Sequence, residues 1–198
     1  MKITSVTFDL SARDLKSCPN DDLPEFAFIG RSNVGKSSML NMLAGEKNAS
    51  KVSASPGNTL LMKFFTINES WRLVDLPGYG YAKGPRANQA TFRDSFEDYI
   101  VKRTNLLCIF ALIDSRHAPQ QIDLEFIHWL VSHDVTFALV FTKTDKLNAK
   151  QFQVNIELFK QSISVWCQPL PEIFACSSKT SSGLPELRGF IQKTLVSG

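Results

Sequence analysis

The stretch GRSNVGKSS, from Gly30 to Ser38, decides the fold that we expect for this chain. It matches the pattern GxxxxGK[ST] at every fixed position, and it lies between the apolar run EFAFI and the helical pattern of residues 39–43. Gly30 and Gly35 let the backbone curl close to a ligand, so that successive N–H groups can point at phosphate oxygens beside the start of the helix. The pattern predicts a strand, a phosphate-binding loop and a helix that ends at Gly45.

Two side chains of this loop suit a bound triphosphate. Lys36 brings a positive charge toward the β and γ phosphates, and the Ser37 hydroxyl is placed to ligate Mg²⁺, which neutralises charge during phosphoryl transfer. The competing interpretation is a glycine-rich turn with a surface lysine. The flanking strand and helix patterns favour the phosphate loop.

Outward from the loop, apolar runs alternate with helical patterns, which is typical of βαβ units. LLMKFFTIN is separated from WRLVDL by only Glu69 and Ser70, a link too short for a parallel crossover, so these two runs should form an antiparallel hairpin. We therefore predict an α/β domain of three layers, with helices on both faces of a six-stranded, mostly parallel sheet that has one antiparallel strand. The strands are EFAFIG, LLMKFFTIN, WRLVDL, LLCIFALID, VTFALVFTK and EIFACSS, and the later helices cover residues 89–103, 120–132, 149–164 and 184–196.

The first residues precede the first clear strand. We expect residues 1–22 to pack as an extra edge segment on a single domain formed by residues 23–198, with Pro19 to Pro24 as the linker. A chain of 198 residues is long enough for one sizeable core and short for two domains.

The composition limits the classes of binding partner that we expect. A formal net charge of +3 permits contact with RNA but is far weaker than that of a dedicated DNA-binding module, so we expect no DNA partner. The N-terminus carries no signal-peptide core and no long apolar run follows, which predicts a cytoplasmic protein without a membrane partner. Cys18, Cys108, Cys167 and Cys176 form no CxxC pair and should be reduced, buried thiols.

The motif DLPG ends one predicted strand. Asp75 emerges at its carboxyl end, the edge where ligands of open parallel sheets bind, and can hold Mg²⁺ through water. Gly78 can offer its N–H to a γ phosphate and respond to its loss on hydrolysis. An ordinary β-turn is an equally acceptable interpretation of DLPG in isolation.

The motif TKTD, Thr142 to Asp145, ends another strand. A carboxylate at Asp145 can accept both N1–H and the exocyclic amine of guanine, whereas adenine presents an acceptor at that ring nitrogen. The Lys143 stem can lie across the base, and the later CSSK supplies small residues and backbone donors for the base carbonyl. A solvated lysine and a helix N-cap remain the alternative for TKTD alone.

GRSNVGKSS, SPGNT, DLPGYGYAK, TKTD and CSSK, in this order, resemble the EngB family of bacterial GTP-binding proteins, also called YihA or YsxC, within the small P-loop GTPases. The resemblance spans nearly the whole chain from Leu23. It implies a Ras-like G domain, binding of GTP and GDP with Mg²⁺, and a role in assembly of the large ribosomal subunit with consequences for cell division.

Matching the family's motifs residue by residue gives the candidate site. Its magnesium ligands are Ser37 and Thr59, and Thr59 lies in a first switch loop, KVSASPGNT. Thr142 stands where many GTPases carry asparagine, and its hydroxyl offers fewer hydrogen bonds, so base affinity should be somewhat weaker. Asn58 stands where a longer basic residue is expected. The nucleotide-binding candidates are Gly30, Arg31, Ser32, Asn33, Val34, Gly35, Lys36, Ser37, Ser38, Gly57, Asn58, Thr59, Leu60, Leu61, Asp75, Leu76, Pro77, Gly78, Thr142, Lys143, Thr144, Asp145, Cys176, Ser177 and Ser178.

The catalytic residue is not identified. Many GTPases orient the attacking water with a glutamine after DxxG, but this chain has Tyr79 there, so hydrolysis should be slow unaided. Lys36 should assist. Asn33 resembles an asparagine of relatives that use K⁺ in place of an arginine finger, although a turn-forming asparagine is an equal alternative.

Two functions follow from these expectations. The first is a monomeric nucleotide switch that docks on ribosomal RNA and protein of the large subunit. The alternative is a switch that binds a protein of the division apparatus directly, without RNA contact. An ATP-dependent enzyme is disfavoured by Asp145.

Overall fold

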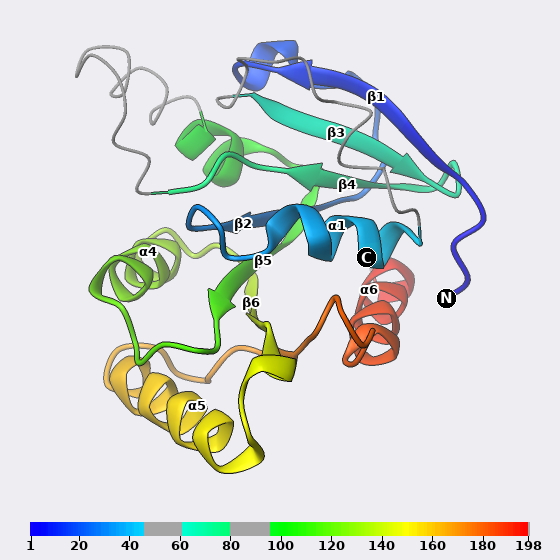
Figure 1. Ribbon diagram of the computed structural model, residues 1–198. Coiled ribbons are helices and arrows are strands. Elements are labelled where there is room, and N and C mark those ends of the chain that lie inside the picture. The colour runs from blue at the N-terminus through cyan, green and yellow to red at the C-terminus, as the bar shows by residue number, and fades with distance from the viewer. Residues whose placement is uncertain (46–60, 80–95, 198) are drawn as a thin grey trace.

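The computed structural model describes residues 1–45, 61–79 and 96–197 (Figure 1). Within these residues seven strands form one sheet in the order β1–β3–β4–β2–β5–β6–β7. The pairings β4–β2, β2–β5, β5–β6 and β6–β7 are parallel, and β3 is antiparallel to both of its neighbours, β1 and β4. The strands are β1 Val6–Ala12, β2 Glu25–Gly30, β3 Met62–Ile67, β4 Trp71–Asp75, β5 Leu106–Asp114, β6 Phe137–Thr142 and β7 Ile173–Ala175.

The hairpin of β3 and β4 forms as predicted, because Asn68 and Glu69 turn the chain with φ angles of 49° and 54°. Two consecutive residues with positive φ are typical of the tight turn whose twist matches paired strands. The Asn68 amide also reaches the N-terminal segment, where its Oδ1 accepts a hydrogen bond from the Thr4 N–H at 2.7 Å.

The predicted strand number of six was wrong, because the N-terminal segment supplies a seventh. β1 pairs with β3 in antiparallel register, from Val6 opposite Ile67 to Ala12 opposite Met62, and extends the sheet at that edge (Figure 1). Residues along β1 alternate between exposed and partly buried, as expected for a strand with one wet face. The sequence carries the matching signal, since apolar Val6, Phe8 and Leu10 alternate with polar Thr7 and Asp9, so this strand was readable from the sequence and was missed.

Helices cover both faces of the sheet. α1 (Lys36–Ala44) and α6 (Leu184–Ser197) share a core with one face, while residues 96–102, α4 (Gln121–Ser132) and α5 (Ala149–Ser164) share a core with the other. Residues 89–95 of one predicted helix lie outside the described residues. None of the helices in the described part of the chain is long and apolar enough to cross a membrane.

All four cysteines are buried and unpaired, as predicted. Burial raises the pKa of Cys108 and Cys176 to about 12 and that of Cys18 to about 11. These thiols are therefore protonated near neutral pH and act as small apolar side chains.

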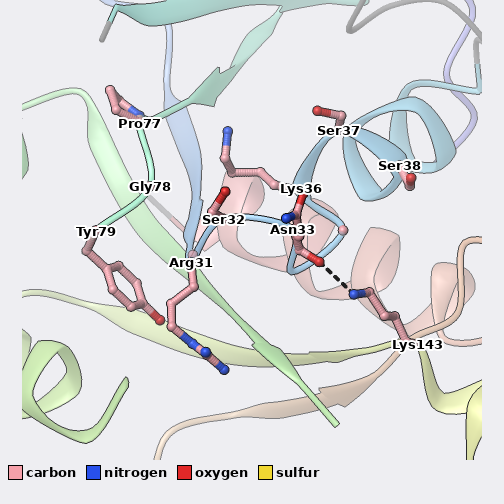
Figure 2. Close-up of a pocket in the computed structure, with 12 residues that line it drawn as sticks. Arg31, Ser32, Asn33, Lys36, Ser37, Ser38, Pro77, Gly78, Tyr79 and Lys143 are labelled. Atoms are coloured by element: carbon pink, nitrogen blue, oxygen red, sulfur yellow. Dashed lines mark hydrogen bonds between the residues drawn. The ribbon is translucent and has the colours of Figure 1, made fainter. Parts of the chain in front are cut away.

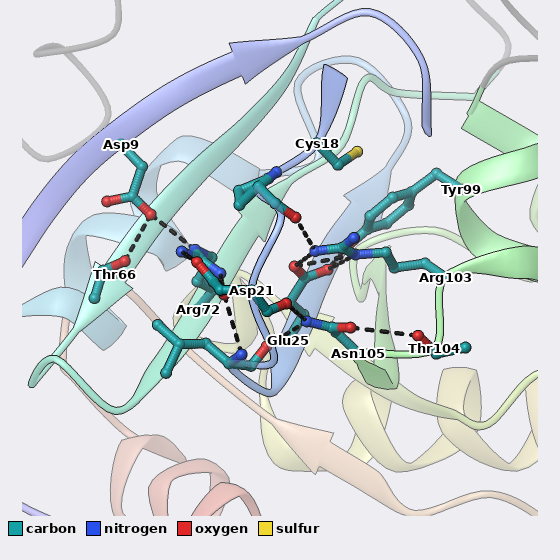
Figure 3. Close-up of polar contacts among 12 residues, drawn as sticks. Asp9, Cys18, Asp21, Glu25, Thr66, Arg72, Tyr99, Arg103, Thr104 and Asn105 are labelled. Carbon is teal, nitrogen blue, oxygen red and sulfur yellow. Dashed lines mark hydrogen bonds and ion pairs between the residues drawn. The ribbon is translucent and has the colours of Figure 1, made fainter. Parts of the chain in front are cut away.

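Charged contacts fasten the N-terminal segment to the sheet (Figure 3). Arg72 of β4, itself 5% exposed, donates its Nε to Asp9 of β1 at 2.8 Å and its Nη2 to Asp21 at 2.6 Å. The hydrogen bond from Arg72 lowers the pKa of Asp21 to about 2. One guanidinium thus joins β1, the linker and β4.

A second cluster fastens the helix at residues 96–102. Glu25, fully buried at the start of β2, accepts hydrogen bonds from the Tyr99 hydroxyl at 2.8 Å and from Arg103 Nη2 at 2.6 Å (Figure 3). Arg103 Nη2 also donates to the Pro19 carbonyl at 2.9 Å. The end of this helix is therefore tied to both β2 and the linker.

Removing the Arg103 guanidinium should destabilise the domain strongly. In Arg103→Leu, Glu25 keeps its Tyr99 contact but becomes a buried carboxylate without its counter-charge, and we expect a loss of about 3 kcal/mol in the free energy of unfolding. Urea denaturation would measure it. Lys102→Ala is the matched control, since its pair with Asp98 is exposed and should be worth less than about 0.5 kcal/mol. Equal, small losses in both variants would contradict the assignment.

Candidate nucleotide-binding site

The loop between β2 and α1 curls because two of its residues adopt positive φ. Asn33 has φ 62° and Gly35 has φ 105°, a value that side chains other than hydrogen rarely allow. Gly30 is required for a different reason, since a Cβ there would lie 2.8 Å from Val34 Cγ1 and 2.9 Å from the Leu112 carbonyl oxygen. The loop therefore wraps tightly just before the N-terminus of α1, where backbone N–H groups attract anions.

A cavity of about 520 Å³ opens beside this loop (Figure 2). Its volume lies within the range of small-molecule and cofactor sites. It is surrounded by the loop, by the segment after DLP and by Lys143, which directly follows β6. The lining residues are Gly30, Arg31, Ser32, Asn33, Gly35, Lys36, Ser37, Ser38, Pro77, Gly78, Tyr79 and Lys143.

Lys36, which lines the cavity, forms an ion pair with Asp75. The Lys36 Nζ donates to Asp75 Oδ1, and the two side chains are 19% and 11% exposed. Asp75 ends β4, which is hydrogen-bonded beside β2, so the sheet itself brings the carboxylate to the loop. A lysine ammonium and a carboxylate are thus adjacent at the loop.

The donor set fits Mg²⁺ held jointly with phosphates. Ser37, which lines the cavity next to Lys36 in the chain, brings a hydroxyl, while the described residues contain no cluster of three or more His, Cys, Asp or Glu side chains that could hold a metal ion by themselves. Mg²⁺ is commonly bound by one or two protein oxygens, waters and substrate phosphates, so this sparse set suits it. Thr59, the other predicted ligand, lies outside the described residues.

The segment after Asp75 lies directly on the loop. An added Cβ at Gly78 would lie 2.6 Å from the Gly30 carbonyl oxygen, so only glycine permits this approach. Leu76 is fully buried in the core and does not reach the cavity. Pro77, Gly78 and Tyr79 therefore form one wall of the cavity.

Tyr79 turns its hydroxyl away from the loop's lysine. It donates a hydrogen bond to Asp123 Oδ1 on α4 at 2.8 Å, and its ring stacks on Phe126 with centroids 4.3 Å apart. Arg31 of the loop binds the same carboxylate, with Nε 2.9 Å from Asp123 Oδ1. Asp123 was not predicted from the sequence, although a carboxylate on the apolar face of α4 was a signal of a buried partner.

Thr142 links β6 to the phosphate loop. Its hydroxyl, 1% exposed, lies 2.6 Å from the Val34 carbonyl oxygen and 3.2 Å from that of Ile113. A hydroxyl has one proton to donate, so the shorter contact with Val34 is the stronger bond. The residue that departs from the commoner asparagine thus braces the loop from behind the cavity.

Lys143 spans the cavity from the end of β6. Its Nζ donates to the Asn33 carbonyl at 2.6 Å (Figure 2). Its backbone has φ 59°, and the same Nζ donates to Asp114 Oδ2 at 2.8 Å. Burial disfavours the ionised form of Asp114, but hydrogen bonds from Arg116 and Lys143 outweigh this, so the pKa of Asp114 lies well below its usual value. Asp114, at the carboxyl end of β5, could have been found by the rule that located Asp75.

TKTD and CSSK meet in space as predicted. Ser177, fully buried, donates its hydroxyl to Asp145 Oδ1 at 2.6 Å, and this hydrogen bond lowers the pKa of Asp145. The Thr144 N–H donates to the Cys176 carbonyl at 3.3 Å. The arrangement holds an ionised carboxylate in one orientation, ready to accept two further donors.

The predicted residues divide into three groups. The first group, most of the loop with Pro77, Gly78 and Lys143, lines the cavity. The second group does not line it and consists of Leu61, which is partly buried just before β3, and of Val34, Asp75, Leu76, Thr142, Thr144, Asp145, Cys176, Ser177 and Ser178. Gly57, Asn58, Thr59 and Leu60 lie outside the described residues.

A phosphate loop joined to DLPG on the neighbouring strand and to the anchored carboxylate of TKTD defines a P-loop GTPase. A family model described as "50S ribosome-binding GTPase" matches residues 25–143. Proteins named "Probable GTP-binding protein EngB" from Christiangramia forsetii and Porphyromonas gingivalis are 46% and 47% identical over 97% and 96% of this chain, and over 97% and 95% of their own. The chain belongs to the EngB family.

Solved structures have the same fold. One titled "Crystal structure of a probable GTP-binding protein engB" aligns with a TM-score of 0.71 at 22% identity, covering 88% of this chain and all of that one. A structure of Era with MgGDPNP and a fragment of 16S ribosomal RNA aligns with a TM-score of 0.61 at 24% identity, over 88% of this chain and 57% of Era's. These likenesses confirm the α/β architecture.

Proposed function

We propose that this protein binds GTP and GDP with Mg²⁺ and acts in the cytoplasm as a nucleotide switch in assembly of the large ribosomal subunit, on which normal cell division depends. The observation that carries the guanine specificity is the hydrogen bond from buried Ser177 to Asp145. It holds an ionised acceptor on the framework that also carries the phosphate loop.

The phosphates occupy the loop in this proposal. Lys36 would leave Asp75 for the β and γ phosphates, the Ser37 and Thr59 hydroxyls would hold Mg²⁺, and Asp75 would hold it through water. Bound Mg²⁺ would neutralise the negative charge that shifts during phosphoryl transfer. Gly78, already against the loop, is placed to offer its N–H to a γ phosphate.

Unaided hydrolysis is slow in this proposal. The phenol of Tyr79 is engaged with Asp123, and a neutral phenol is a poor base for water. Burial raises the pKa of Tyr79 well above its ordinary value, so the group stays protonated at physiological pH. A partner or a cation therefore has to supply the acceleration.

A potassium effect tests the second possibility. If the Asn33 amide helps to hold K⁺, GTP hydrolysis should be faster in potassium chloride than in sodium chloride, and Asn33→Gly should remove the difference. Glycine keeps the positive φ of 62° and so leaves the turn intact. Equal rates in both salts, unchanged by the substitution, would leave Asn33 with the turn as its function.

The ribosomal role is supported by membership of the EngB family and by the description of the matching family model. Co-sedimentation with separated ribosomal subunits, in GDP and in a non-hydrolysable GTP analogue across a salt series, tests it. We expect binding to the large subunit with the analogue only, weakening steeply with salt as phosphate contacts do. Absence of binding in both states, with nucleotide affinity intact, would favour the direct division-apparatus partner.

A further inference from the structure

Asp123 is a buried carboxylate that joins the two walls of the cavity. It lies in the first turn of α4 and is 1% exposed, yet it receives Arg31 Nε at 2.9 and 3.2 Å and the Tyr79 hydroxyl at 2.8 Å. Arg31 belongs to the phosphate loop, and Tyr79 follows DLPG. One side chain outside the family's nucleotide-binding motifs therefore holds both segments that meet at the phosphate end of the site.

The phosphate loop and the segment after DLP also contact each other directly, through the residues that precede Arg31 and Tyr79. Gly78 precedes Tyr79, and Gly30 precedes Arg31; an added Cβ on Gly78 would lie only 2.6 Å from the Gly30 carbonyl oxygen. Without Asp123, the loop and the segment after DLP would each lose an anchor beside this contact. The carboxylate thus limits how far Gly78 can move from the loop.

The surroundings of Asp123 make the anchor rigid. The Tyr79 ring stacks on Phe126 with centroids 4.3 Å apart, and Phe126 stacks on Trp129 at 6.0 Å, so the phenol is packed along α4 as well as hydrogen-bonded. Burial raises the pKa of Asp123, while the hydrogen bond from Tyr79 and the charge of Arg31 oppose the rise. An acidic residue in the first turn of a helix is also favoured by the helix dipole.

We propose that Asp123 is a positioning residue for nucleotide discrimination: by holding Arg31 and Tyr79 together it keeps Gly78 against the phosphate loop, and so favours a triphosphate over a diphosphate. The inference rests on the proposed GTP and GDP binding. Only a γ phosphate would receive the Gly78 N–H, so pre-positioning this group benefits GTP and leaves GDP nearly unaffected.

The test compares affinities for fluorescent GDP and a fluorescent non-hydrolysable GTP analogue, both with Mg²⁺. In Tyr79→Phe, which removes one hydroxyl and keeps the ring stack, and in Asp123→Asn, the preference for the analogue should fall about tenfold, as expected when one hydrogen bond to a charged group is lost. GDP affinity should change less than about twofold. The double variant should lose little more than either single one, since both remove the same link.

Glu125→Gln is the matched control, because it makes the same kind of change on an exposed position of the same helix and should behave as wild type. Unchanged preference in folded Tyr79→Phe would overturn the proposal, and so would equal losses for GDP and the analogue, which indicate a merely structural role. Tyr79→Phe decides alone if Asp123→Asn does not fold. Wild type that binds neither nucleotide would instead refute the proposed function.

Discussion

Asp145→Asn should convert the site from guanosine to xanthosine nucleotides. The new amide would present a donor where guanine also presents donors, whereas the extra carbonyl of xanthine can accept from it. A site built to hydrogen-bond one partner typically rejects the mismatched one by about ten-thousandfold, so we expect GTP affinity to fall by about a thousandfold or more. Competition titrations with GTP and XTP would measure the change in nucleotide preference.

The controls for this change come from the same chain. Asp134→Asn makes an identical substitution at an exposed residue with φ 54°, a conformation that asparagine tolerates, and should leave GTP binding unchanged. Ser177→Ala removes the anchor of Asp145, together with the acceptor of the Lys179 and Thr180 N–H groups, and should weaken GTP binding without creating a preference for XTP. An Asp145→Asn protein that still preferred GTP would show that another group reads the base.

Lys36→Ala should cost at least about a hundredfold in triphosphate affinity, because charge-assisted contacts to more than one phosphate are lost together. The structure adds a second cause. Asp75 would lose the ammonium that now neutralises it and would face the incoming phosphates as an unpaired negative charge. Isothermal titration with GTP and Mg²⁺ would measure the loss.

One further variant separates the two causes, and another serves as the control. Lys36→Ala combined with Asp75→Asn should recover part of the affinity if repulsion from Asp75 contributes. Lys150→Ala removes one exposed positive charge elsewhere and should have little effect. Unchanged GTP affinity in folded Lys36→Ala would exclude the loop as the phosphate site.

Local patterns account for what could be predicted. The loop was readable because its glycines, lysine and serine lie within nine residues, between a strand and a helix of clear periodicity. TKTD and CSSK were assigned to one base from their chemistry, and the structure brings them together because they follow β6 and β7, which are parallel neighbours.

Contacts between distant residues could not be predicted in the same way. The alternation of residues 6–12 is compatible with a half-buried strand, but its pairing with β3 depends on the free edge that β3 offers, which lies about 55 residues further along the chain. Asp123 acquires its partners only when α4 packs beside the phosphate loop and the segment after DLP; it lies 92 residues from Arg31 and 44 from Tyr79. Thr142 looked like a weakened base contact, yet the folded chain uses its hydroxyl to brace Val34.

The most direct test of the central claim is calorimetric titration of the purified protein with GTP, GDP and ATP in the presence of Mg²⁺. The structure and the motifs predict saturable binding of both guanine nucleotides at one site per chain, with ATP weaker by about a thousandfold or more. Binding of ATP as tight as that of GTP would contradict the assigned role of Asp145. Absence of binding for all three nucleotides by the folded protein would contradict the nucleotide site itself.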